Sequence, residues 1–109
     1  MQEILDLAEK LGNLLRNDNR FRALMEAEKK VMADAEAKKL LEDFQTQSER
    51  IMERERRLQP VEVEDKQRLR ELHEKVAGHP LIKELTKARV EYAELMSKVN
   101  RAIFGREEE

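Results

Sequence analysis

Apolar residues recur along this chain at alternating steps of three and four, which is the spacing of one face of an α-helix. Pro80 suits the first turn of a helix, and Gly105 suits a left-handed residue after the last turn. Between them the pattern predicts a long C-terminal helix over about 80–104. Its stripe consists of Leu81, Leu85, Ala88, Tyr92, Leu95, Val99 and Ala102, widened by Ile82, Met96 and Ile103.

A first amphipathic helix is predicted over residues 3–16. Gly12 lies inside this helix, where a glycine costs about 1 kcal/mol relative to alanine. It indicates either a close approach of another backbone or a weak, mobile helix. The turn Asn17-Asp18-Asn19 ends the helix, because these side chains cap helices and tolerate turn conformations. The apolar face is formed by Ile4, Leu7, Ala8, Leu11, Leu14 and Leu15.

The apolar pattern changes phase near Ala33-Asp34-Ala35. At about 100° per residue, the stripe after this point lies roughly half a turn from the stripe before it. Asp34 could cap a new helix, so we favour a kink or a helix start there; the alternative is one continuous helix over 19–58. The stripe before the change consists of Phe21, Leu24, Met25, Val31 and Met32. The stripe after it consists of Ala37, Leu40, Leu41, Phe44, Ile51 and Leu58.

The turn Gln59-Pro60-Val61 is expected to end the third helix, and a fourth is predicted over about 62–77 with Gly78 as its C-terminal cap. The fold class is therefore all-α, with four to five amphipathic helices in an antiparallel bundle. A single domain over 1–109 is expected. Within it, residues 1–33 form a helical pair engaged in oligomerisation, residues 34–105 form the bundle, and residues 106–109 form an acidic tail.

Charged residues make up 42% of the chain, but 22 Lys and Arg nearly balance 24 Asp and Glu, so the formal charge is only −2. Such a balance implies no strong field towards nucleic acid or anionic lipid. The sequence contains no cysteine, which excludes disulfides and thiolate ligands. No apolar run approaches the roughly 18 residues of a membrane span, and the start lacks a signal-peptide pattern. We expect a cytoplasmic protein without membrane insertion.

Candidate chemistry is sparse. His73 and His79 are the only histidines, and neither follows a glutamate by three residues or belongs to an HExxH motif. We therefore expect no metal, no cofactor, no small-molecule substrate and no catalytic residue. The most basic stretch contains Arg50, Arg54, Arg56 and Arg57, interrupted by glutamates. A surface of mixed charge is the favoured interpretation of these arginines; direct RNA contact is the alternative.

Helices three, four and five are expected to bury one another's apolar faces. The apolar stripes of the first two helices would then stay partly exposed, because too little of the chain is left to cover them. Exposed apolar surface of this extent usually marks an interface. The simplest arrangement is a homodimer that pairs these segments about a two-fold axis. The candidate interface residues are Leu11, Leu15, Phe21, Leu24, Met25, Val31, Met32, Met96, Ile103 and Phe104.

The segment His79-Pro80-Leu81-Ile82-Lys83-Glu84-Leu85, with Ala88-Arg89 and the run from Leu95 to Ile103, resembles the C-terminal half of the YlbF/YmcA family. The stretch from Asp34 to Phe44 resembles the middle helix of that family. The resemblance implies a non-enzymatic, bacterial helical protein that associates with itself or with relatives and regulates development or RNA processing. Some members carry cysteines linked to an iron–sulfur cluster, whereas this chain is more similar to the cysteine-free branch.

Overall fold

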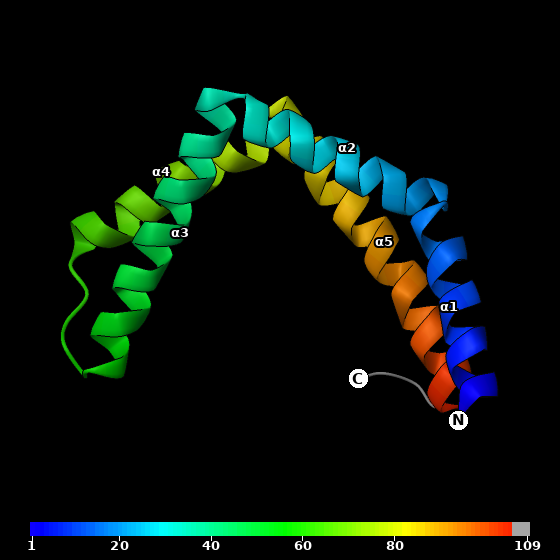
Figure 1. Ribbon diagram of the computed structural model, residues 1–109. Helices are drawn as coiled ribbons and strands as arrows, with labels where there is room; N and C mark the ends of the chain where they lie inside the picture. Colours follow the sequence, from blue (N-terminus) through cyan, green and yellow to red (C-terminus); the bar gives the residue numbers. More distant parts are fainter. Residues whose placement is uncertain (106–109) are drawn as a thin grey trace. The chain divides into compact units, whose positions relative to one another are not determined.

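The computed structural model describes residues 1–105, and all regular structure in that range is helical (Figure 1). The elements are α1 (Gln2–Arg16), α2 (Asn19–Ala33), α3 (Ala35–Arg56), α4 (Val63–Gly78) and α5 (Pro80–Phe104). The all-α class and the long C-terminal helix are thereby confirmed. The expected acidic tail, residues 106–109, lies outside the described residues.

The chain breaks between α2 and α3 at Asp34. Its backbone is extended (φ −100°, ψ 113°), and its Oδ1 accepts a hydrogen bond from the Ala37 N–H at 2.9 Å. This carboxylate satisfies one of the free N–H groups of the first turn of α3. The new helix start at Asp34 is therefore confirmed, and residues 19–58 are not one continuous helix.

The end of α3 differs from the expectation. The helix stops at Arg56, and Leu58 adopts a left-handed conformation with φ 56°. The Leu58 N–H donates to the Glu55 carbonyl at 3.1 Å, and the Gln59 N–H donates to the Arg54 carbonyl at 2.8 Å. These two bonds form a Schellman motif, in which glycine usually occupies the left-handed position. The prediction that Leu58 lies on the α3 stripe was wrong for this reason.

The two glycines predicted to end helices differ in outcome. Gly105 has φ 66°, and its N–H donates to the Arg101 carbonyl at 2.7 Å, so it is the left-handed residue after α5 as predicted. Gly78 is the last residue of α4 and does not adopt a positive φ. The helix ends instead because His79 is extended (φ −79°, ψ 124°) ahead of Pro80, as steric contact with a proline ring favours.

The described chain divides into two compact units, and each takes part of α2 and part of α5. The first unit, Lys29–Glu84, is built on α3 and α4, which lie side by side (Figure 1). The side-chain amide of Gln47 on α3 donates to the Asp65 carbonyl on α4 at 2.9 Å. Buried residues of this unit are Val31, Ala37, Gln47, Ile51, Asp65, Leu72 and Ile82.

The second unit comprises Met1–Glu28 and the chain from Leu85 onward. Its buried residues are Leu24, Ala27, Leu85 and Ala88. The rings of Phe21 on α2 and Tyr92 on α5 lie 6.0 Å apart between centroids, a tilted aromatic contact. This unit therefore groups α5 from Leu85 with α1 and the first part of α2, and the expected division of the chain at residue 34 stays a prediction.

Candidate functional site

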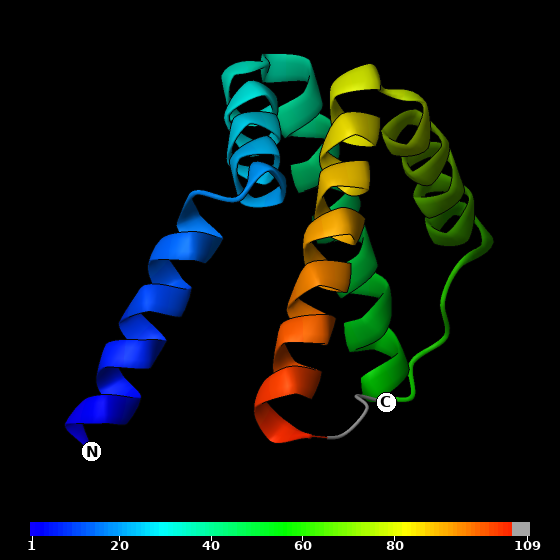
Figure 2. The ribbon, with the colours of Figure 1, turned by 90° about the vertical axis from the view of Figure 1, so that its right-hand side faces the viewer.

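The apolar side of α1 lies largely uncovered within the chain. No residue of α1 is buried, although its apolar and polar residues are sharply separated. Ile4, Leu7 and Leu14 are exposed by 71, 61 and 71%, and Leu11 is half-buried. We call these four residues the α1 face. In Figure 2 the α1 ribbon stands apart from α5, which agrees with this exposure.

Hydrogen bonds and charges within α1 and its ends stabilise this helix, because packing buries none of its residues. Glu3 lies in the first turn and Arg16 in the last, so both charges suit the helix dipole. The Gln2 amide donates to the Asp6 carboxylate at 2.9 Å, and the Asn17 amide donates to the Asn13 carbonyl at 2.8 Å. An isolated helix of this length is only marginally stable in water. The α1 face therefore lies on an element that would gain stability from a partner.

The residues predicted for an oligomer interface fall into three groups. Met25, Met32, Ile103 and Phe104 are exposed, and the last two end α5 in the same unit as α1. The half-buried members are Leu11, Leu15, Phe21 and Met96. Leu24 and Val31 are buried by the chain itself and contribute no open surface. The interface itself stays a prediction, and only the exposed and half-buried members offer surface for it.

Three residues of the α1 face, Ile4, Leu7 and Leu14, were not among the predicted interface residues. They belong to the same helical stripe as Leu11, so the periodicity contained the signal. Periodicity shows which residues share a face, but it does not show how much of that face the rest of the chain covers.

An ion pair fixes the turn that follows the α1 face. The Asp18 carboxylate accepts hydrogen bonds from Nε and Nη2 of Arg20, both at 2.9 Å, and from the Arg20 N–H at 2.8 Å. These bonds, the side-chain ones above all, lower the pKa of Asp18 from 3.8 to about 2. The same carboxylate raises the pKa of the Arg20 guanidinium. The turn from α1 into α2 is thus held by charge-assisted bonds.

The four arginines of the alternative RNA surface all lie near carboxylates. Arg50 Nη2 and Arg54 Nε each lie 3.9 Å from an oxygen of Asp65, whose Oδ2 has no hydrogen-bond partner. Arg56 and Arg57 contact the Glu53 carboxylate at 2.9 and 2.8 Å. Each positive charge of this stretch therefore faces a negative one within the chain.

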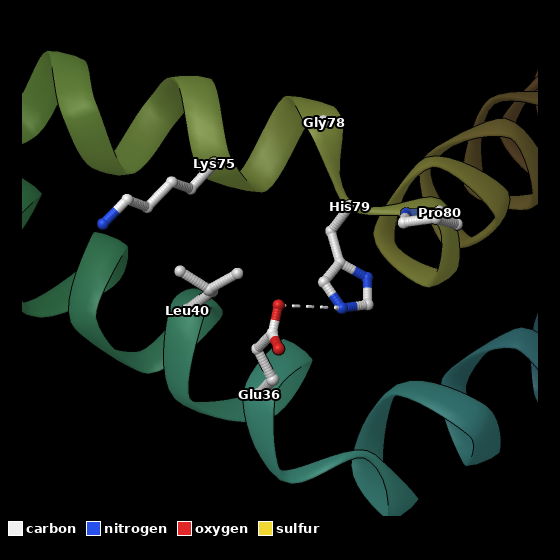
Figure 3. A pocket seen from close by; sticks show the side chains of 6 residues that line it. All are labelled: Glu36, Leu40, Lys75, Gly78, His79 and Pro80. Carbon is white, nitrogen blue, oxygen red and sulfur yellow. Dashed lines mark ion pairs between the residues drawn. The ribbon is translucent and has the colours of Figure 1, made fainter.

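Figure 3 shows a hollow between α3 and α4, with Glu36, Leu40, Lys75 and His79 in its wall. The His79 ring is mostly buried, and its Nε2 lies 3.7 Å from Glu36 Oε1 and 3.9 Å from Asp34 Oδ1. Its Nδ1 accepts a hydrogen bond from the Leu81 N–H at 3.2 Å. The ring therefore links the start of α5 to the start of α3.

The second histidine lies apart from this hollow. His73 stands elsewhere, 5.9 Å from the Phe44 ring between centroids. Among the described residues no group of three or more histidines and carboxylates could hold a metal ion.

Comparisons with known proteins give one consistent family. A UPF0342 protein of Streptococcus pyogenes serotype M4 is 27% identical over 104 residues, covering 95% of this chain and 92% of the relative. A UPF0342 protein of Lactobacillus acidophilus is 29% identical over 101 residues, covering 93 and 87%. One from Desulfitobacterium hafniense is 26% identical over 98 residues, covering 90 and 75%.

Two further findings bear on the class of protein. Within residues 1–105, no helix is long and apolar enough to cross a membrane. The family model described as "Control of competence regulator ComK, YlbF/YmcA" matches residues 4–106. The match spans all five helices, including the α1 face. The chain therefore belongs to the YlbF/YmcA family of competence-control regulators.

Proposed function

We propose that this protein is a non-enzymatic helical adaptor that acts by binding other proteins, beginning with a second copy of itself through the α1 face. One observation supports this most strongly: α1 is an amphipathic helix with no buried residue. Exposed apolar surface of this kind usually marks a protein interface. The family description supports a regulatory role, in competence or a related bacterial process.

The energy available to such an interface is moderate. Fully burying a leucine-sized side chain contributes about 1.5–3 kcal/mol, so the α1 faces of two chains, which start partly covered, offer on the order of 10 kcal/mol. Association itself costs an estimated 4–15 kcal/mol in lost freedom. The two terms are of similar size, so the proposed homodimer should depend on protein concentration. Ile103 and Phe104 at the end of α5 add apolar surface from the same unit.

The test is the mass of the purified protein in solution. Size exclusion coupled to light scattering should give about twice the chain mass of 12.9 kDa. Leu14→Glu places a charge on the α1 face and should shift the mass to that of one chain. Because Leu14 is exposed within a single chain, this substitution leaves the core intact. Circular dichroism should still show a helical protein.

The matched control is Glu9→Lys, a charge change on the polar side of the same helix. It should leave the doubled mass unchanged. A wild-type monomer at micromolar concentration would contradict the proposed self-association. So would a Leu14→Glu variant that keeps the doubled mass.

A further inference from the structure

The α1 face has the spacing of a coiled-coil seam. Its four residues, Ile4, Leu7, Leu11 and Leu14, follow one another at steps of three, four and three, which brings them onto one side of the helix. Residues 1–10 are all exposed, whereas Leu11 is half-buried within the chain. A second helix with the same seam could pack along this side in two directions, parallel or antiparallel to α1.

The charges of α1 are separated along its length. The first half of the helix carries the acidic residues Glu3, Asp6 and Glu9 and no base. The second half carries Lys10 and Arg16 and no acid. None of these five side chains forms an ion pair with another residue in the described part of the chain. The helix therefore offers a negative half and a positive half to a partner.

This charge distribution favours one of the two directions. In a parallel pair, the acidic halves of the two helices would lie side by side, and so would the basic halves. In an antiparallel pair, each acidic half lies along a basic half. The axes of packed helices are about 8–10 Å apart, within the Debye length of about 10 Å at 0.1 M salt, so these charges act on one another. The half-charges of the helix ends are smaller and do not reverse the preference.

The antiparallel direction also determines which apolar residues meet. With the two seams fully overlapped, Ile4 of one copy would pack against Leu14 of the other, and Leu7 would pack against Leu11. Ile4 and Leu14 are each 71% exposed within one chain, and this arrangement covers both of them in both copies. In a parallel pair, by contrast, every residue of the seam would meet the same residue of the other copy.

We propose that two copies of this chain pair their α1 helices antiparallel, so that the acidic half of each helix lies along the basic half of the other. Ile4 of each copy packs against Leu14 of the other, and the two-fold axis passes midway between these two residues. This inference rests on the self-association proposed above. It names the segment of the second copy that covers the α1 face, which is the other α1.

The test is disulfide trapping, because the chain contains no cysteine of its own. Two single variants of the full chain, Ile4→Cys and Leu14→Cys, place the thiol at positions that are exposed within one chain. One of them carries an additional affinity tag, so a gel without reductant separates the mixed adduct from each self-adduct. A disulfide requires Cβ atoms about 3.5–4.5 Å apart, so it joins only residues that meet.

The matched control is Glu9→Cys, which places the thiol on the polar side of the same helix. Light scattering before oxidation sets the protein concentration at which each variant is a dimer. We expect the mixture of Ile4→Cys and Leu14→Cys to form the mixed adduct roughly tenfold more than either self-adduct. Glu9→Cys should form no adduct above background.

Salt gives a second measurement, because opposite charges that attract are screened by it. The dissociation constant of the wild-type dimer should rise as NaCl is raised from about 50 to about 500 mM. Predominant self-adducts of Ile4→Cys and Leu14→Cys, no mixed adduct in a dimeric sample, or a dimer that tightens with salt would overturn the inference.

Failure of the proposed self-association is read separately, from the mass of the wild-type protein by light scattering. A doubled mass together with self-adducts would leave self-association standing and remove the antiparallel arrangement. A monomeric wild type would remove both.

Discussion

At the residue scale, the two left-handed positions within residues 1–105 allow a reciprocal test of backbone strain. The left-handed conformation costs an L-residue about 1–2 kcal/mol, and glycine loses roughly 0.5–1 kcal/mol through its freedom in the unfolded chain. Leu58→Gly should therefore raise the free energy of unfolding by about 0.5–1 kcal/mol in urea titrations. The reverse exchange at the other left-handed position, Gly105→Leu, should lower it. A loss of stability in Leu58→Gly would mean that the leucine side chain packs within the chain.

The bonds between Asp18 and Arg20 make stability depend on pH. The folded-state pKa of Asp18, about 2, lies below its ordinary value of 3.8, so the contribution is present above about pH 4 and is lost as the pH falls towards 2. Asp18→Asn should flatten the decline of unfolding free energy over this window. Arg20→Gln should act in the same way, because it removes the main cause of the shift. Acid titrations of both variants that run parallel to wild type would contradict this linkage.

At the scale of elements, local chemistry predicted most of the helix limits. Pro80 and Gly105 bound α5, and Asp34 separates α2 from α3, because each acts on backbone within a few residues. The left-handed conformation of Leu58 was not predicted. It is set by the hydrogen bonds that close the end of α3, and glycine, not leucine, is the residue that usually indicates such a position.

The candidate site could be predicted only in part. Periodicity placed Leu24 and Leu14 on apolar stripes, yet the chain buries the first and leaves the second exposed. Similarly, the sequence showed arginines interrupted by glutamates but not that Arg50 and Arg54 face Asp65. The burial of an apolar face and the pairing of charges on different helices both depend on how the helices pack. The order of residues along one helix does not determine that packing.

The absence of buried residues in α1 predicts how this helix behaves in dilute solution. Elements with little packing open locally at low free energy, so amides of residues 2–16 should exchange hydrogen faster than those of α3 and α4. Raising the protein concentration should slow that exchange, because self-association would cover the α1 face. In Leu14→Glu the exchange should stay fast at every concentration. Strong protection of α1 in a monomer would show that the helix needs no partner.

At the scale of the whole molecule, RNA binding would require an excess of positive charge, whereas an adaptor that binds proteins does not require one. RNA affinity would come largely from unpaired positive charges, and its logarithm would fall with that of salt concentration by about 0.7 per phosphate contacted on a single strand. The chain has a net charge of −2. The arginines that would form the RNA surface face Asp65 and Glu53. Two carboxylates thus lie against these four arginines and offset part of their positive charge.

We therefore expect no saturable binding of single-stranded RNA at physiological salt, measured by fluorescence anisotropy at micromolar protein. Arg57→Ala, which removes an exposed surface pair, should change stability by less than about 1 kcal/mol. Arg54→Ala should cost on the order of 1 kcal/mol or more, because it removes one of the two cations facing the buried Asp65 carboxylate. If RNA bound with a steep salt dependence that both substitutions abolished, these arginines would be a nucleic-acid surface, and the adaptor function would have to give way to it.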